Sequence, residues 1–272
     1  MEKSSVIGLT LGIIVILSSM VLKGAHLSFL NNPAAFIVIL GGTVAAVFMA
    51  FPMRDLKKVG KLFKIVFSKP KLIDRKELIA MFMEWAMITR REGLLALENR
   101  VEEVKDPFLY EGMRMIIDGN DQEFVRDVLL EDIAAMEERH QAGAQIFSQA
   151  GTYAPTLGVL GAVIGLIAAL ANLSDVDQLA HAVAAAFVAT MLGIFTGYVL
   201  WHPIANKLKR LSKYEVETKL MMVEGLLSIQ SGISTIAIQQ KLSVFLTPEE
   251  REELNRREAE RREAERAQIS EA

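Results

Sequence analysis

The chain has 272 residues, of which 51% are hydrophobic and 23% charged, and its formal net charge is −3. It contains no cysteine, which excludes a disulfide framework and a thiolate metal site. Its four histidines are scattered without an HExxH spacing, and no nucleophile–base pair stands out. We therefore expect neither an enzyme nor a cofactor-binding protein, and no nucleic-acid partner.

Four long windows contain no Asp, Glu, Lys or Arg. About 20 apolar residues are enough for a helix to cross the hydrocarbon core. The fold class predicted is an all-α, polytopic membrane protein with four transmembrane helices and a cytoplasmic helical domain. The predicted spans are 4–22, 33–52, 148–173 and 179–203. Because these spans hold no carboxylate, they have no obvious group of their own to carry an ion through lipid.

Basic residues gather after the second and fourth spans, and the short connections within each pair of spans hold only Lys23. The basic residues after the second span are Arg54, Lys57, Lys58, Lys61, Lys64, Lys69 and Lys71, and those after the fourth span are Lys207, Lys209, Arg210 and Lys213. Cytoplasmic loops carry the excess of Lys and Arg. We therefore predict a multi-pass protein of the inner membrane with both termini in the cytoplasm.

This orientation divides the chain into five predicted segments. They are 1–52 with spans one and two, 53–147 as the cytoplasmic domain, 148–205 with spans three and four, 206–247 as a cytoplasmic helical tail, and 248–272 as a charged terminus. The last segment is Glu/Arg/Ala-rich and fits either a frayed helix or disorder, with too little apolar surface to pack.

Helical periodicity dominates the 53–147 segment. Arg54–Phe67 fits either a basic amphipathic helix at the membrane surface or an ordinary basic flank of a span. Asp74 and Glu77 form a capping-box-like start, and Gly93 is a plausible stop. Further helices are predicted over 94–104, over 107–117, and from Asp121 onward, the last one continuing into span three. The apolar content suits a small helical bundle.

Small residues recur along spans three and four. They are Gly158, Gly161 and Gly165, then Ala185, Ala189, Gly193 and Gly197. Such stripes let helix backbones approach closely. They serve either to pack the two spans against each other or to accept a helix of another chain. The length of both stripes favours the second interpretation, a crowded multi-subunit centre.

Pro155 and Pro203 lie at the predicted cytoplasmic ends of spans three and four, where each removes a backbone hydrogen bond. They mark either a hinge or two ordinary helix ends. Thr190, in mid-span, either bonds the carbonyl four residues back or lines a wet path. Arg90 and Glu98 belong to a charge cluster around Gly93, a pattern typical of a solvated surface.

Several stretches together resemble the MotA family of flagellar motor stators. In chain order they are NPAA at 32–35, RREGLLALE at 90–98, GTYAPTLG at 151–158, GIFTGY at 193–198, and Pro203. The resemblance extends to about residue 245 and leaves out the C-terminal segment. It implies a stator subunit that forms, with MotB, an ion channel converting ion flow into torque on the rotor.

MotB, the partner that the resemblance implies, has one membrane helix, a membrane aspartate and a cell-wall-binding domain. Five chains of the MotA type are thought to surround a MotB pair. In this family, Arg90 and Glu98 match the pair that meets the rotor protein FliG. Pro155 and Pro203 match prolines tied to conformational coupling, and Thr190 matches a hydroxyl that faces the MotB aspartate.

Sodium-driven relatives tend to have threonine where this chain has Ala162. A methyl group offers no oxygen to a dehydrating Na⁺, so we predict that the transported ion is H⁺. An ExbB/TolQ-type energiser remains an alternative, although such chains typically have three spans. A secondary transporter would need polar groups and broken helices at mid-membrane, and none is evident.

Overall fold

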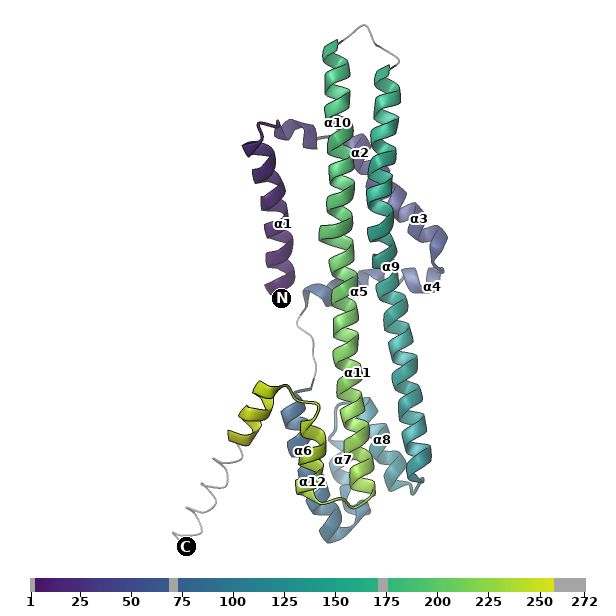
Figure 1. Cartoon of the computed structure of the whole chain (residues 1–272). Helices are drawn as coiled ribbons and strands as arrows, with labels where there is room; N and C mark the ends of the chain where they lie inside the picture. The colour runs from purple at the N-terminus through teal and green to yellow at the C-terminus, as the bar shows by residue number, and fades with distance from the viewer. Residues whose placement is uncertain (1–2, 69–72, 171–175, 257–272) are drawn as a thin grey trace. The chain divides into compact units, whose positions relative to one another are not determined.

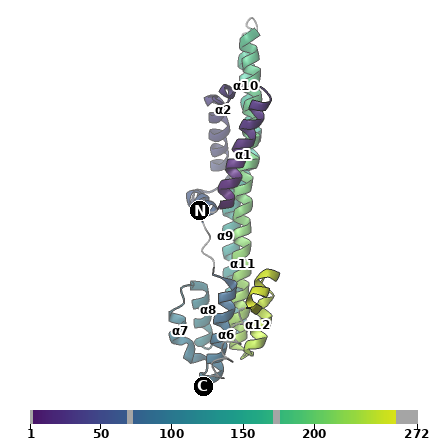
Figure 2. The same cartoon turned by 90° about the vertical axis from the view of Figure 1, so that its left-hand side faces the viewer.

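The computed structural model describes residues 3–68, 73–170 and 176–256, and this part of the chain is helical without any strand (Figures 1 and 2). Four helical stretches are long and apolar enough to cross a membrane. They are Lys3–Leu22, Leu27–Ala50, Gln122–Leu170 and Val176–Gln230. The predicted all-α class with four membrane-spanning helices is therefore confirmed.

The chain separates into two compact units. The membrane unit comprises Met1–Pro70 and Glu138–Ser212, and the bundle unit comprises Lys71–Glu137 and Lys213–Ala272. Helices α9 (Gln122–Leu170) and α11 (His202–Gln230) contribute residues to both units. The five segment boundaries predicted from the sequence depend on where a membrane would end, and they stay predictions.

Spans one and two differ in regularity. Span one is the single helix α1 (Lys3–Leu22). Span two follows the short 3-10 turn η1 (Leu27–Leu30) and consists of α2 (Pro33–Phe36), a π-helical turn η2 (Ile37–Gly41) and α3 (Gly42–Ala50). Its start is sharp because the Asn32 side chain accepts a hydrogen bond from the Ala35 amide, and proline suits the first helical position.

The basic segment after span two forms α4 (Met53–Leu56) and α5 (Val59–Phe67). Val66 is buried, whereas Lys61 and Lys64 are exposed, so α5 is amphipathic. The Ser5 hydroxyl of α1 donates a hydrogen bond of 3.0 Å to the Val66 carbonyl. This contact ties the start of span one to α5. Lys69 and Lys71, counted in the basic cluster, lie outside the described residues.

Spans three and four are continuous with the helices that follow or precede them. The predicted extension of the helix from Asp121 into span three is confirmed, because α9 runs unbroken past Pro155. Span four is α10 (Val176–Phe195), followed by a second π-helical turn, η4 (Thr196–Trp201), and then α11. The wide turn ends two residues before Pro203, whose missing N–H leaves the carbonyl four residues back without its usual donor.

The bundle unit is built from α6 (Arg75–Glu92), η3 (Leu94–Leu97), α7 (Glu98–Glu102), α8 (Pro107–Ile117) and α12 (Thr235–Ser243), with the flanking parts of α9 and α11. Its core gathers large apolar side chains from these helices. Among them are Leu78, Phe82, Leu109, Met113, Leu226 and Leu227. A methyl group at Gly225 would lie 2.5 Å from the Phe82 ring, so this glycine lets α6 pack closely on α11.

The helix ends of the bundle unit follow their capping residues. Asp74 accepts from the Lys76 amide and begins α6, and Gly93 ends it with φ of +85°, a conformation that glycine adopts without steric cost. Asp106 caps α8 at the Leu109 amide, and Asp121 accepts from the Phe124 amide at the start of α9. The helix predicted over 94–104 is instead split into η3 and α7.

The beginning of the charged C-terminal segment is folded. Residues 248–256 are helical, and Thr247 and Glu250 satisfy each other's amides as a capping box. Leu254 is buried in the bundle core, and Glu253 pairs with Lys76 at 2.6 Å. The expectation that this segment lacks enough apolar surface to pack is therefore wrong for 248–256. Residues 257–272 lie outside the described part of the chain.

Candidate functional site

The membrane unit brings α9 and α10 into backbone contact, and the two helices run side by side in Figure 1. A Cβ atom added to Gly158 would lie 2.9 Å from the Gly193 Cα, and one added to Gly193 would lie 2.8 Å from the Gly158 Cα. Neither position has room for a side chain. Main-chain contact of this kind is what small residues in membrane helices permit.

Pro155 belongs to the same contact. A Cβ on Gly197 would lie 2.7 Å from the Gly151 carbonyl oxygen and 2.8 Å from Cγ of the Pro155 ring. Because proline has no N–H, the Gly151 carbonyl lacks its helical donor, and Gly197 covers it. Pro155 is half-buried and sits inside an unbroken helix.

The small-residue stripes therefore pack largely against their own chain. At Gly158, Gly193 and Gly197 the expectation that they accept a helix of another chain is wrong, because span three or span four already fills the space. A Cβ added to Gly161 would lie 3.5 Å from a methyl carbon of Val38 in span two, an ordinary packing distance. Among the stripe glycines in the described residues, Gly165 alone has no atom within 4 Å of an added Cβ.

Thr190 is half-buried on α10, and its hydroxyl donates a 3.2 Å hydrogen bond to the Ala186 carbonyl. Thr190 therefore does bond the carbonyl four residues back, which was one of the two interpretations of this residue. The bond uses the hydroxyl proton and leaves oxygen lone pairs available as acceptors. Ala162, on α9, is 8% exposed. Thr190 offers a hydroxyl group and Ala162 a methyl group, and neither side chain carries a charge.

Around Pro203 the structure holds a feature that sequence reasoning missed. Pro203 is exposed and is the second residue of α11, which begins where the η4 turn ends. Within that turn, the indole N–H of Trp201 is buried and has no hydrogen-bond partner in the described part of the chain. Its ring packs 6.3 Å from that of Phe147. A buried unpaired donor is uncommon in folded proteins, and the sequence carries no signal for it.

Arg90 and Glu98 lie in the bundle unit on either side of Gly93. Arg90 is exposed in the last turn of α6, and Glu98 is exposed at the first position of α7. Among the described residues, neither forms an ion pair with the other or with a third group. Both charges therefore face solvent.

Glu98 also contributes to the field at a neighbouring cation. The pKa of the Arg114 guanidinium is raised above its ordinary value, first by its hydrogen bond and charge interaction with Tyr110, then by Asp118, with Glu98 adding a smaller effect. Arg114 lies on α8 and is exposed. The surface around Glu98 thus carries charges of both signs.

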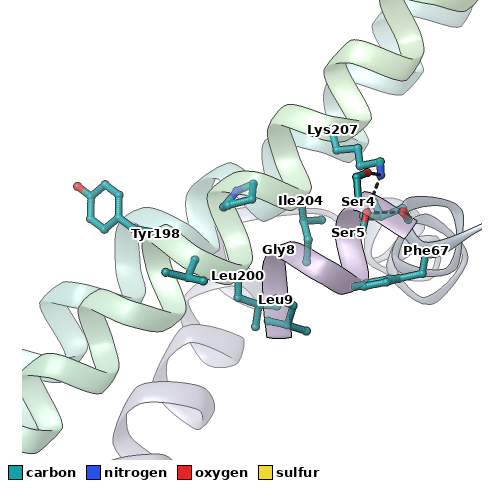
Figure 3. A pocket seen from close by; sticks show the side chains of 12 residues that line it. Ser4, Ser5, Gly8, Leu9, Phe67, Tyr198, Leu200, Ile204 and Lys207 are labelled. Atoms are coloured by element: carbon teal, nitrogen blue, oxygen red, sulfur yellow. Dashed lines mark hydrogen bonds between the residues drawn. The ribbon is translucent and has the colours of Figure 1, made fainter. Parts of the chain in front are cut away.

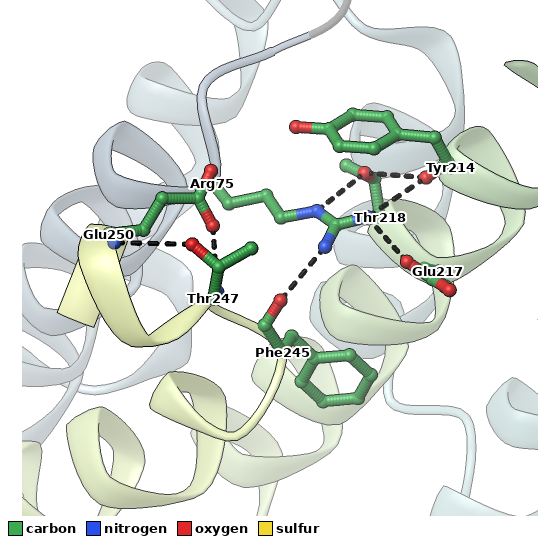
Figure 4. A network of polar contacts seen from close by, with 7 residues as sticks. All are labelled: Arg75, Tyr214, Glu217, Thr218, Phe245, Thr247 and Glu250. Atoms are coloured by element: carbon green, nitrogen blue, oxygen red, sulfur yellow. Dashed lines mark hydrogen bonds and ion pairs between the residues drawn. The ribbon is translucent and has the colours of Figure 1, made fainter.

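Arg75, at the start of α6, is a buried cation of the bundle unit (Figure 4). It was not among the candidates identified from the sequence. It is 5% exposed. Its guanidinium donates to Thr218 Oγ1 at 3.1 Å, to the Phe245 and Tyr214 carbonyls at 2.8 and 3.2 Å, and to Glu217 at 3.0 Å. It also lies 4.0 Å from the Tyr214 ring centroid. These contacts join α6, α11 and the segment after α12.

Comparison with known proteins places this geometry in a family. The profile described as "Motility protein A N-terminal" matches residues 6–93, and that of the "MotA/TolQ/ExbB proton channel family" matches 100–221. The chain is 56% identical to Motility protein A of Bacillus subtilis over 251 residues, which are 92% of this chain and 93% of that protein. The chain belongs to the MotA/TolQ/ExbB proton channel family.

Further relatives are similar to this chain in sequence and in structure. Chemotaxis protein PomA of Vibrio alginolyticus is 32% identical, over 92% of this chain and 98% of that protein. The structure of the flagellar MotAB stator complex from Bacillus subtilis superposes with a TM-score of 0.87 at 55% identity, covering 92% of this chain and 98% of that chain. A C. jejuni MotAB structure gives the same TM-score of 0.87 at 30% identity, covering 91% of this chain and 97% of that chain.

The resemblance to the MotA family is confirmed by these matches. The chain is a multi-pass membrane protein of the flagellar stator type, a subunit of an ion channel and not an enzyme. The relatives named for motility favour this role over that of an ExbB/TolQ-type energiser. The individual roles of Arg90, Glu98, Pro155, Ala162, Thr190 and Pro203 stay predictions.

Proposed function

We propose that this chain forms a ring of five around a pair of MotB-type chains in the inner membrane, with both termini in the cytoplasm. Together they conduct protons and turn the flow into torque on the rotor protein FliG. The observation that carries the proposal is the α9–α10 pair, closed by backbone contact at Gly158 and Gly193 and free of carboxylates in both spans. The titratable group must then come from the partner.

The partner's aspartate would meet a wall with little charge of its own. When ionised, it would be costly to hold there, and protonation would remove most of that cost. Thr190 supports this step, because its hydroxyl oxygen can accept a hydrogen bond from a protonated carboxyl while its own O–H continues to donate to the Ala186 carbonyl. Each charge that crosses 100 mV releases about 2.3 kcal/mol, which bounds the work per ion.

Proton coupling is supported by two observations. The matching family is described as a family of proton channels. Ala162 presents a methyl group where a sodium path would want an oxygen ligand, and it is nearly buried. A proton needs no cage of oxygen ligands, so the Thr190 hydroxyl beside apolar side chains suffices.

Movement would pass through the segment that ends span four. The Pro155–Gly197 contact holds the start of η4 against α9, so the rest of that turn, together with Pro203, is the nearest place where the helix can change its winding. The unpaired indole N–H of Trp201 would gain a partner if such a change brought an acceptor to it. Arg90 and Glu98, both exposed, would then deliver the motion to complementary charges on the rotor.

Reconstitution tests the proposal. This chain and a single-span partner with a membrane aspartate are placed together in liposomes that contain a pH-sensitive dye, and a potential is applied. Proton entry is expected only with both proteins, and an Asp→Asn change in the partner should stop it while the complex still assembles. Equal flux from this chain alone would contradict the proposal, because the chain would then need no outside carboxylate.

A further inference from the structure

The contact between α9 and α10 leaves one side of this helix pair open. On both helices, the residue after a glycine of the contact is exposed, which is Thr152 after Gly151 and Ile194 after Gly193. One residue turns a helix by about 100°. Because α9 and α10 run in opposite directions (Figure 1), equal turns lead to the same side of the pair. Thr190, four residues before Ile194, lies on this open side as well.

Spans one and two cover the opposite side of the pair. Ala150, which precedes the contact on α9, packs with Val47 of span two. On η4, Val199 lies 2.6 Å from a Cβ added to Gly12 of α1. Leu9 of the same helix lines a cavity beside η4 (Figure 3). Within the described part of the membrane unit, the open side is therefore the face that a partner or water can reach.

Polar side chains follow the open side of α9 through the first half of span three. We call them the polar stripe, and they are Gln145, Ser148, Thr152 and Thr156. Their spacing of three or four residues keeps them on one helix face. Gln145 and both threonines are exposed. The next residues on this face, Val159 and Val163, are exposed and apolar, so the polar stripe ends inside the span.

The inner end of the polar stripe lies close to the depth of Thr190. The Cβ of Ala189, its neighbour, is 4.0 Å from a Cβ added to Gly161, about one helical turn beyond Thr156. From Gln145 to Thr156 the helix rises about 16 Å. That length is about half of a hydrocarbon core of about 30 Å. The polar stripe is thus long enough to connect Thr190 with one surface of the membrane.

The two threonines of the polar stripe keep acceptors for water. Thr152 donates to the Ser148 carbonyl at 3.1 Å, and Thr156 donates to the Thr152 carbonyl at 3.5 Å. These bonds use the hydroxyl protons and leave lone pairs on the oxygens. Water molecules can donate to those lone pairs and bridge from one group to the next. Residues 141–174 contain no charged side chain, so nothing fixed on this face would trap a passing ion.

We propose that the polar stripe lines a water-filled path by which protons leave the partner's carboxyl for the cytoplasm. This inference rests on the proposed function and adds an exit route to it. A proton released near Thr190 passes from the carboxyl to the nearest water, which leaves the carboxylate behind, and then moves from water to water along the stripe. Because the same face is apolar beyond Thr156, the stripe accounts for the exit of protons and not for their entry.

Cysteine labelling tests whether the polar stripe is wet, and this chain has no cysteine of its own to interfere. Thr152→Cys and Thr156→Cys are made separately in the full complex with a cysteine-free single-span partner. Inverted membrane vesicles are treated with a charged methanethiosulfonate that does not cross lipid. We expect both thiols to react at least about tenfold faster than the thiol of Val44→Cys, because the reagent attacks the thiolate, which lipid disfavours.

Val44→Cys is the matched control for depth. Val44 is 53% exposed on α3, between Gly42, which meets Leu157 of α9, and Val47, which packs with Ala150. It therefore lies near the depth of the two threonines but on another span. Equally slow reaction at Thr152→Cys, Thr156→Cys and Val44→Cys would show that the polar stripe faces lipid or dry protein, and would refute the path.

Valine variants test whether the path conducts. Thr152→Val and Thr156→Val, made together, replace both hydroxyls by methyl groups of similar size. In the liposome assay they should lower proton flux about fivefold, the effect of one lost hydrogen bond of ordinary strength, while the complex still assembles. Thr43→Val is the control, because the buried Thr43 hydroxyl donates to the Ile39 carbonyl within span two. It should leave the flux unchanged, and full flux in the double variant would refute the exit route.

The two readouts separate this inference from the proposed function. Labelling detects water and needs no proton flux, so it decides for or against the path even if the unmodified complex conducts nothing. Normal flux through an unmodified complex whose polar stripe is dry would uphold the proposed function and overturn the exit route.

Discussion

Gly193 and Gly158 show how a single hydrogen atom in place of a side chain can decide the spacing of two membrane helices. The atoms that an added Cβ would meet belong to the opposite main chain. A flexible side chain could turn aside, but a backbone can yield only if the whole helix moves. This contact between spans three and four is thus intolerant of even one methyl group.

We therefore expect Gly193→Ala to destabilise the purified complex by about 1–3 kcal/mol, the usual range for overpacking. The measurement is the thermal unfolding midpoint in detergent, with subunit assembly followed by size-exclusion chromatography. Gly165→Ala adds the same methyl group to the neighbouring stripe where no atom lies within 4 Å, and it should leave the midpoint nearly unchanged. Equal effects of the two substitutions would contradict the argument from backbone contact.

Arg90 supports a different kind of prediction, because its side chain is exposed and unpaired among the described residues. Arg90→Glu should abolish swimming, while the stability of the protein changes by no more than about 0.5 kcal/mol, as is usual for surface substitutions. Motility on soft agar and the unfolding midpoint together check both parts.

Arg126→Glu provides the control, since Arg126 is an exposed arginine of α9 in the same bundle unit. It should leave swimming intact. A compensating charge reversal on the rotor should partly restore the Arg90→Glu strain. Normal swimming by that strain without compensation would remove the proposed rotor contact.

At the scale of the element, Arg75 connects parts of the chain that are far apart in sequence. Its guanidinium bonds to residues of α11 and to the carbonyl of Phe245, and each of those acceptors faces the start of α6. The planar fork carries five N–H donors in a fixed geometry, whereas an ammonium group has only three donors on a single nitrogen. Arg75 thus adds a polar anchor for the start of α6 to the apolar packing of the same helix.

Arg75→Lys should therefore lower the stability of the bundle unit even though it keeps the charge. We expect a loss of about 2–4 kcal/mol, somewhat below the cost of breaking a fully buried pair because Glu217 is partly exposed. Urea unfolding monitored by circular dichroism measures it. Arg91→Lys, an exposed arginine on the same helix, should have little effect, and a similar loss there would count against the network.

Helix boundaries of the bundle unit could be predicted well, because local capping decides them. Asp74, Gly93 and Asp121 each marked an end that the structure contains. The π-helical turns η2 and η4 could not be predicted, since their winding depends on how neighbouring helices pack. The same holds for Leu254, whose burial is set by a core assembled from distant segments.

The candidate site was accessible to sequence reasoning only in part. Spacing alone left two interpretations for Thr190, Pro155 and Arg90, and the functional one came from the resemblance. The partners of Arg75 and the unpaired Trp201 indole depend on residues brought together by folding, so no local pattern contains them. Tertiary contacts likewise decided which stripe glycines were already covered.

At the scale of the whole molecule, charge is divided between the two kinds of segment. The four spans carry no carboxylate, whereas the bundle helices carry charges of both signs on their exposed faces. In an ion-driven machine that contains this chain, a partner chain must therefore supply the titratable group within the membrane. In the proposed function, the chain would contribute the wall of the ion path and the surface that contacts the rotor.

This division leads to a prediction about the driving ion. Swimming speed of cells that depend on this chain should be unchanged in sodium-free medium and should fall to zero when a protonophore collapses the proton gradient. Tracking of single cells in matched sodium and potassium buffers measures it. Speed that rises with sodium concentration, at constant pH, would show that Ala162 does not exclude sodium coupling.

The burial of Leu254 has a practical consequence for anyone who labels this protein. A fluorescent reporter joined after Arg256 would leave the leucine in its core and the Lys76–Glu253 pair intact. Trimming the chain back to Thr247 before fusion would remove both, and Lys76 would keep only its longer contact of 3.9 Å with Asp74. A labelled form of the protein should therefore keep residues 248–256, so that the label reports on an undamaged motor.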